Sequence, residues 1–186
     1  SGRRCSGSRV LGHGDIVRLL VEGGATVGAA DALLRDGQTT LMLAARAGSV
    51  PAIETLLANG AVPNAVERRT GTTALMWAAL DDRADAIHVL VRGGADVNAR
   101  ASRTAFPHTP PGVIGDPLEE GSSYVGQTVL PKGGWTALMY AARQGARGAV
   151  AALAESNADL DATDPDGSTA LALAAINGHA EVVSLL

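Results

Sequence analysis

GTTALMWAA, at residues 71–79, is the stretch of sequence that decides the fold. Its pattern, Gly-x-Thr-x-Leu-x-x-Ala-Ala, returns at 37–45, 134–142 and 167–175, so successive copies begin 34, 63 and 33 residues apart. A period near 33 residues indicates an array of stacked units that bury their apolar sides against one another. The 63-residue spacing is one period plus about 30 residues, so it predicts an insertion between two repeats.

One unit shows how the sequence builds two short helices. Thr73 is suited to cap a first helix over 74–80, because its hydroxyl can accept a hydrogen bond from a backbone N–H of the first turn. A second helix over 84–92 follows from the apolar i, i+3, i+4 spacing that begins at Ile87. A residue that accepts a left-handed backbone ends the second helix of each unit, at Gly24, Gly60, Gly94 and Asn157.

Paired alanines close the motif in every copy: Ala44-Ala45, Ala78-Ala79, Ala141-Ala142 and Ala174-Ala175. Such small side chains let neighbouring helices approach closely, and a bulky residue in their place would overpack the stack. We therefore expect these pairs at the contacts between repeats.

Several of these motifs resemble the ankyrin repeat family. They are Asp-Gly-x-Thr-x-Leu at 36–41 and 166–171, Gly-Ala-Asp-Val-Asn-Ala at 94–99, and Gly-His at 12–13 and 178–179. The family's unit is a β-turn followed by two antiparallel helices. The resemblance therefore implies an all-α solenoid of helix–turn–helix units with β-turn fingers and one long loop insertion.

The expected organisation is a single repeat domain over 1–186. It divides into a partial repeat at 10–34, repeats at 35–67 and 68–100, an insertion at 101–131, a repeat at 132–163 and a truncated repeat at 164–186. The apolar run 182–186 would be left uncovered at the end of the array. We expect either further repeats beyond Leu186 or end-to-end self-association through this run.

Composition narrows the classes of function. A formal net charge of -4 and a pI near 5.5 argue against nucleic-acid binding, which needs a concentrated basic face. The single cysteine and the four histidines show no metal-ligand spacing, and no nucleotide-binding or nucleophile motif occurs. We therefore expect no cofactor and no enzymatic activity. The sequence contains no run of 18 apolar residues, so no membrane span is expected. The cellular compartment stays open.

The resemblance also implies a binding surface, the concave surface formed by turn residues beside the repeat glycine and by the exposed side of the first helix. The matching positions here are Arg35, Gln38, Arg46, Arg69, Thr72, Leu80, Lys132, Trp135, Arg143, Gln144, Ser168, Ile176 and Asn177. Five of these side chains are basic, and the only acidic neighbour is Asp81, so an acidic protein partner is expected. The alternative is that the arginines serve only solubility.

Three aromatic residues receive different interpretations. Trp135 occupies a variable turn position, where a large ring has little core to fill, so it is a candidate interface hot spot. Alternatively, the inserted segment folds over Trp135 and buries it. Trp77 and Tyr140 lie two residues after the repeat leucine and are expected in the core.

The insertion at 101–131 contains five prolines and four glycines, which exclude a long helix. Its apolar side chains, Tyr124 among them, exceed what a solvated coil carries. One interpretation is a folded excursion that forms a wall of a binding cleft and contributes Tyr124 to it. The other is a tolerated surface insertion, since the entropy of loop closure grows slowly with length.

The sequence thus predicts a non-catalytic protein–protein interaction scaffold that binds its partner through the concave face and the 101–131 insertion. The alternative is a structural or regulatory repeat segment of a larger multidomain protein, which packs on other domains or on further repeats.

Overall fold

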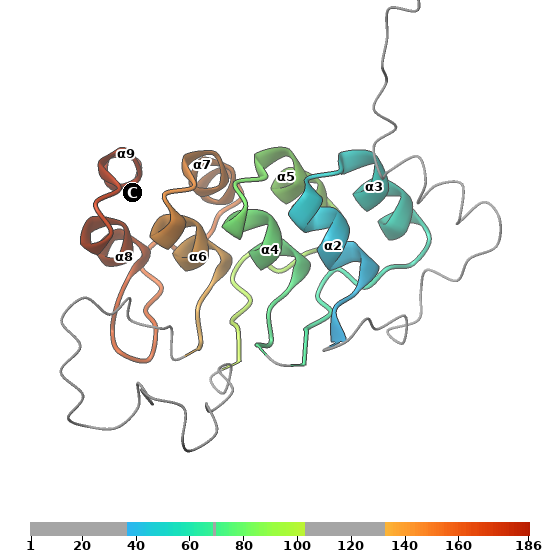
Figure 1. Ribbon diagram of the computed structural model, residues 1–186, viewed down its shortest axis with the longest axis horizontal. Helices are drawn as coiled ribbons and strands as arrows, with labels where there is room; N and C mark the ends of the chain where they lie inside the picture. The colour runs from blue at the N-terminus through green and yellow to red at the C-terminus, as the bar shows by residue number, and fades with distance from the viewer. Residues whose placement is uncertain (1–36, 69, 103–132) are drawn as a thin grey trace, which may run out of the picture.

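The structure is a computed structural model that describes residues 37–68, 70–102 and 133–186, and these residues form two parallel rows of short helices (Figure 1). The first row holds α2 (Thr40–Ala47), α4 (Ala74–Leu80), α6 (Ala137–Gln144) and α8 (Ala170–Ile176). The second row holds α3 (Val50–Ala58), α5 (Ala84–Arg92), α7 (Arg147–Glu155) and α9 (Ala180–Val183). The loops between repeats extend as fingers from the side of the first row. The expected all-α repeat solenoid is confirmed.

A threonine hydroxyl starts every helix of the first row. In each case it accepts a hydrogen bond from the backbone N–H three residues later, at 3.2 to 3.4 Å, and the caps are Thr39, Thr73, Thr136 and Thr169. A cap of this kind contributes about 1 kcal/mol to helix stability. The predicted cap at Thr73 and the predicted bounds of both helices in that unit are confirmed.

The second helices end as the sequence predicts. Gly60, Gly94 and Asn157 have φ angles of 88°, 90° and 61°, so all three adopt the left-handed backbone. The fourth expected position, Gly24, lies outside the described residues. Asparagine tolerates this conformation better than most residues with a Cβ atom, which explains its use in place of glycine.

The paired alanines lie at the contacts between helices of the first row. Ala78 and Ala79 of α4, like Ala141 and Ala142 of α6, are completely buried. The helix α4 packs against α2 on one side and α6 on the other. The alanine pairs therefore set a close and regular spacing between successive repeats.

The insertion replaces a single finger turn. The amide of Glu67 donates to the carbonyl of Thr72, and the amide of Asp164 donates to that of Ser168, both at 3.0 Å. At the equivalent place in the intervening repeat, the amide of Ala101 donates to the carbonyl of Trp135 at 2.9 Å. Residues 102–134 thus stand where the other fingers have three or four residues.

The helices on either side of the insertion remain in contact. The amide of Gly134 donates back to the carbonyl of Ala101 at 2.9 Å, so the two ends of the excursion are held together. Beyond it, α6 packs on α4 and α7 packs on α5, as in the uninterrupted repeats. Residues 103–132 lie outside the described residues, so the folded excursion expected to contribute Tyr124 stays a prediction.

Polar bonds from each repeat reach back to the one before it. The Nε of Arg83 donates to the carbonyl of Arg46 at 3.2 Å, and Nε2 of His179 lies 2.9 Å from the carbonyl of Arg143. In the described repeats these carbonyls come from the last turn of the first helix, where four carbonyls lack an intrahelical partner. His179, which follows the repeat glycine Gly178, thus has a structural role.

Asp82 supplies the corresponding link between the second and third repeats. Its Oδ1 accepts a hydrogen bond of 2.6 Å from the amide of Ala149, in the first turn of α7. The N-cap residue of α7 is Ala146, which has no side-chain acceptor, so the cap comes from the preceding repeat. Asp82 itself adopts a left-handed backbone, with φ of 54°.

We expect Asp82→Ala to lower the free energy of unfolding by about 1–2 kcal/mol, because it removes a helix cap and places an alanine in a left-handed conformation. Asp82→Gly should cost less, since it loses the cap but relieves the backbone. Urea unfolding followed by circular dichroism measures both variants. Glu54→Ala, at an exposed carboxylate of α3, is the control. Equal stabilities of Asp82→Ala and Glu54→Ala would contradict the assignment.

Candidate interaction face

The side of the first-row helices that is turned away from the second row of helices forms a face whose side chains are exposed or partly buried, with Leu173 as the buried exception. Three positions of each repeat define it, and we call it the concave face. Its first row of side chains is Leu43, Trp77, Tyr140 and Leu173; its second is Arg46, Leu80, Arg143 and Ile176; its third is Ala47, Asp81, Gln144 and Asn177. The residues directly before and after Leu43, Trp77 and Tyr140 are core, so the helical period itself separates this face from the interior.

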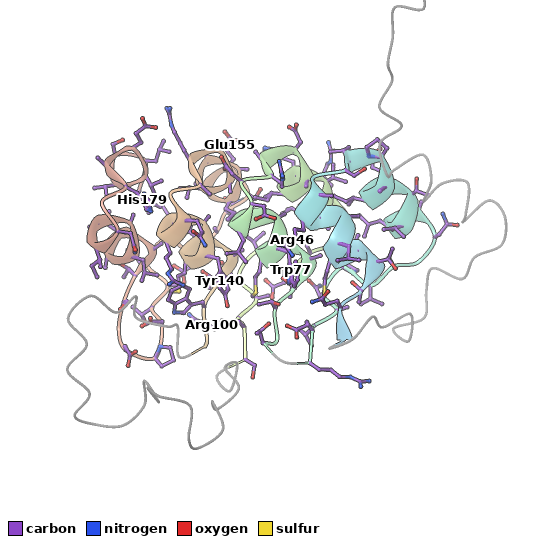
Figure 2. All side chains as sticks on the ribbon, viewed as in Figure 1. Arg46, Trp77, Arg100, Tyr140, Glu155 and His179 are labelled. Carbon is purple, nitrogen blue, oxygen red and sulfur yellow. The ribbon has the colours of Figure 1, made fainter. Side chains whose placement is uncertain are left out.

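Arg46 and Trp77 form one cluster on this face, across neighbouring helices (Figure 2). The guanidinium carbon of Arg46 lies 5.3 Å from the centroid of the Trp77 ring, within the range of a cation–π interaction. Its Nε also donates to Oδ2 of Asp81 at 3.3 Å. The side chain of Arg46 remains 60% exposed, so this ion pair contributes at most about 1 kcal/mol.

Trp135 belongs to a second cluster. Of its two interpretations, the exposed hot spot is wrong, and whether the inserted segment covers the ring lies outside the described residues. The ring is 2% exposed. Its Nε1 donates to Oδ2 of Asp164 in the next finger at 3.1 Å. Tyr140 meets the Trp135 ring edge-on, with ring centroids 5.3 Å apart. The guanidinium carbon of Arg143 lies 5.6 Å from the centroid of the Trp135 ring. Trp135 therefore supports the face from beneath and presents no exposed ring to a partner.

Trp77 and Tyr140, expected in the core, are only partly buried. Both pack against the core from the first row of the concave face. The Nε1 of Trp77 donates to Oγ1 of Thr72 at 2.9 Å, which fixes the ring against the adjoining finger. Sequence reasoning missed these residues and Leu43 as surface candidates. The sequence did hold a signal for their exposure. Each lies three residues before Arg46, Leu80 or Arg143, and residues three apart share one side of a helix.

Glu67 is a buried carboxylate at the base of a finger. Its Oε2 accepts hydrogen bonds from the amide of Thr70 at 3.2 Å, from the hydroxyl of Thr70, and from the hydroxyl of Thr72 at 3.4 Å. Thr72 in turn accepts from Trp77, so the carboxylate and the aromatic side chain belong to one polar network. This network fixes the finger relative to the face.

Tyr140 has a strongly shifted hydroxyl. Burial raises its pKa to about 12; the positive charge of Arg143 acts in the opposite direction, and the negative charge of Glu67 adds to the increase. The phenol therefore stays neutral at any physiological pH and serves as a packing group.

The structure places the other expected site residues as follows. Arg46 and Gln144 are exposed, Gln38, Leu80, Arg143 and Ser168 are partly buried, and Thr72 is buried. Ile176 and Asn177 are exposed on the last repeat. Arg35, Arg69, Lys132 and Tyr124 lie outside the described residues. Of the five expected basic side chains, the structure thus describes Arg46 and Arg143.

The last repeat exposes positions that the earlier repeats bury. Leu171 is 43% exposed, whereas its equivalent one repeat earlier, Leu138, is 1% exposed under α8. Val183 and Leu185 are exposed as well, while Val182 points into the core. We call Leu171, Val183 and Leu185 the end face. The apolar run 182–186 was expected to be uncovered, but only part of it is exposed, because Val182 is buried.

Two further observations concern only residues 37–68, 70–102 and 133–186. Within them no group of three His, Cys, Asp or Glu side chains is arranged to hold a metal ion. None of their helices has the length and apolar character needed to cross a bilayer.

The chain also matches a known protein family. A family model described as ankyrin repeats (3 copies) matches residues 8–101 and 120–186. The match leaves out residues 102–119, inside the insertion. A search of curated proteins found no match.

The contrast between the two tryptophans is directly measurable, because the chain contains only these two. With Trp77→Phe, the remaining Trp135 should emit at shorter wavelength and resist quenching by acrylamide. With Trp135→Phe, the remaining Trp77 should emit at longer wavelength and be quenched several-fold more strongly, provided circular dichroism shows the helices intact. Equal quenching of the two would contradict the burial of Trp135.

Proposed function

The chain belongs to the ankyrin repeat family, whose repeats are generally protein–protein interaction modules, and we propose that it is a scaffold that binds a partner protein through its concave face and the 101–131 insertion. The family is typically non-catalytic, and the proposed role requires no catalysis. The observation that carries the proposal is the composition of the concave face, which leaves Leu43, Trp77, Leu80 and Tyr140 incompletely buried among arginines.

These side chains suit an interface for a physical reason. Aromatic residues and arginine dominate the binding energy of protein interfaces, because they bury much apolar area and still donate hydrogen bonds. Here the rings of Trp77 and Tyr140 are already fixed by contacts with Arg46 and Trp135. Binding would therefore immobilise few additional side chains, which reduces its entropic cost.

The position of the insertion supports its part in the proposal. The two ends of the insertion are joined by the hydrogen bond from Gly134 to Ala101, beside Trp135. Trp135 lies beneath Arg143, which belongs to the second row of side chains on the concave face. A long loop that leaves a rigid scaffold next to such a face is where binding residues are disproportionately found. Arg35, Arg69, Lys132 and Tyr124 remain part of this proposal as expected contacts.

Deleting 103–132 tests the role of the insertion with little damage to the scaffold. The deletion leaves Ser102, Gly133 and Gly134 between Ala101 and Trp135, the same three-residue length as the finger between Asp164 and Ser168. We expect an unchanged melting temperature together with loss of proteins captured from a host lysate. Leu80→Glu on the concave face should lose the same proteins.

The control for this experiment is His88→Ala on α5 of the second row, which should retain every captured protein. Unchanged capture by both the deletion and Leu80→Glu would rule out the proposed surface. Unchanged capture by the deletion alone would remove the insertion from it.

A second candidate function has its own observation, the end face. We propose that it packs against another helical repeat, either in a second copy of this chain or in a larger assembly of domains. Leu138 and Val150, the equivalents of Leu171 and Val183, are buried at the contact with the following repeat. Leu171 and Val183 thus occupy positions that, one repeat earlier, lie at a contact between repeats, which supports this proposal.

We expect self-association that depends on concentration and that Leu171→Glu abolishes, measured by sedimentation velocity. Leu43→Glu, the same substitution at an exposed leucine of the concave face, should leave the self-association intact. A strictly monomeric wild-type chain at the highest soluble concentration would contradict end-to-end association.

A further inference from the structure

We infer that the segment bound on the concave face is an acidic stretch of the partner protein, with two carboxylates about 16–20 Å apart and apolar side chains between them. This inference rests on the proposed function and specifies the chemistry of the partner. It follows from the charge, the fixation and the spacing of Arg46 and Arg143.

The charge of the concave face differs from that of the whole chain. The chain has a formal net charge of -4. Within the three rows of the concave face as the structure describes them, the ionisable side chains that carry charge at neutral pH are Arg46, Arg143 and Asp81. The face is thus locally basic on an acidic protein, and a segment with carboxylates is steered towards it rather than to the rest of the surface.

Both arginines are held in place by tryptophan. Arg46 lies over Trp77 and Arg143 over Trp135, and these are the two cation–π pairs found among the described residues. The N–H groups of a guanidinium lie in its plane, so stacking on a ring through its face leaves them able to donate hydrogen bonds. Two of these N–H groups can bind both oxygens of one carboxylate through two parallel hydrogen bonds. Because stacking already restricts the side chain, less entropy is lost when the carboxylate binds.

The existing ion pair of Arg46 leaves room for this role. Asp81 accepts from Nε of Arg46, at 3.3 Å, while the Arg46 side chain stays 60% exposed. A guanidinium has five N–H donors, so one bond to Asp81 leaves its terminal nitrogens able to donate elsewhere. Arg143 makes no equivalent pair with its own third-row neighbour, which is the neutral Gln144.

The surface between the two arginines is apolar. Leu80 lies between the two arginines in the second row of side chains on the concave face. Trp77 and Tyr140 flank it in the first row of side chains. All three are partly buried, so a ligand side chain placed there contacts apolar carbon. The middle of the bound segment is therefore apolar, and its carboxylates lie towards its two ends.

The repeat spacing sets the distance between the carboxylates. Arg46 and Arg143 are on α2 and α6, which are separated by α4. Packed helices lie about 8–10 Å apart, so two steps span about 16–20 Å. An extended segment covers this distance in about six residues, and a helix in about eleven. Both separations place the two carboxylates on the same side of the segment.

The test is selection from a displayed library of random 20-residue peptides, with the wild-type chain as bait. Peptides that lose binding to Leu80→Glu are taken as ligands of the concave face. Among them we expect enrichment of Asp or Glu at two positions about six or eleven residues apart, with apolar residues between. Arg46→Gln and Arg143→Gln should each weaken binding about tenfold.

Charge reversal makes the test sharper. The double variant Arg46→Glu/Arg143→Glu should select Lys or Arg at the same two positions. Arg92→Glu and Arg147→Glu, on α5 and α7 of the second row, are the matched controls and should select the wild-type motif. Circular dichroism establishes that each bait is folded.

The outcomes separate the two levels of the argument. Peptides that need Leu80 but show no paired acidic positions would overturn the acidic ligand and leave the concave-face scaffold standing. Competition by a 20-nucleotide single-stranded DNA would also overturn it, because a polyphosphate would then satisfy the arginines. If no selected peptide is sensitive to Leu80→Glu, both the acidic ligand and the proposed function fail.

Discussion

Close contact between the first helices of successive repeats is the constraint on which the rest of the structure depends. Completely buried alanines, Ala78-Ala79 and Ala141-Ala142, line these contacts. Without a bulky side chain between them, the helices stack at a constant spacing and in a constant rotational register. Every repeat therefore turns the same three positions to one side, and side chains that are 33, 34 or 63 residues apart in sequence become rows on one face.

The insertion is compatible with this constraint because it enters at a finger turn and not at a helix contact. Ala101 exchanges hydrogen bonds with Gly134 and Trp135, as the corresponding residues do in the short fingers. Loop closure costs only about 0.6 kcal/mol for each doubling of loop length, so a short finger can become a long one at little expense in stability. A chain can in this way acquire a new segment beside the concave face without losing the regular face itself.

Local sequence was sufficient to predict the elements of the fold, but not the environment of the aromatic residues. Caps, helix bounds and left-handed ends depend on neighbours within a few residues, and Thr73, Gly94 and Asn157 behave as predicted. The indole N–H of Trp135 donates to Asp164 in the next finger, a contact that no local pattern reveals. The bond from Asp82 to the amide of Ala149 likewise joins residues 67 positions apart, across the insertion.

The stack continues across the insertion and so presents one face from α2 to α8. Native-state hydrogen exchange on the full chain, resolved by residue, tests this most directly. The account predicts that the most protected amides of α4 and α6 open with the same free energy and respond equally to added urea, because the two helices unfold as one cooperative unit. Distinct opening free energies on the two sides of residues 103–132, with separate urea dependence, would contradict it.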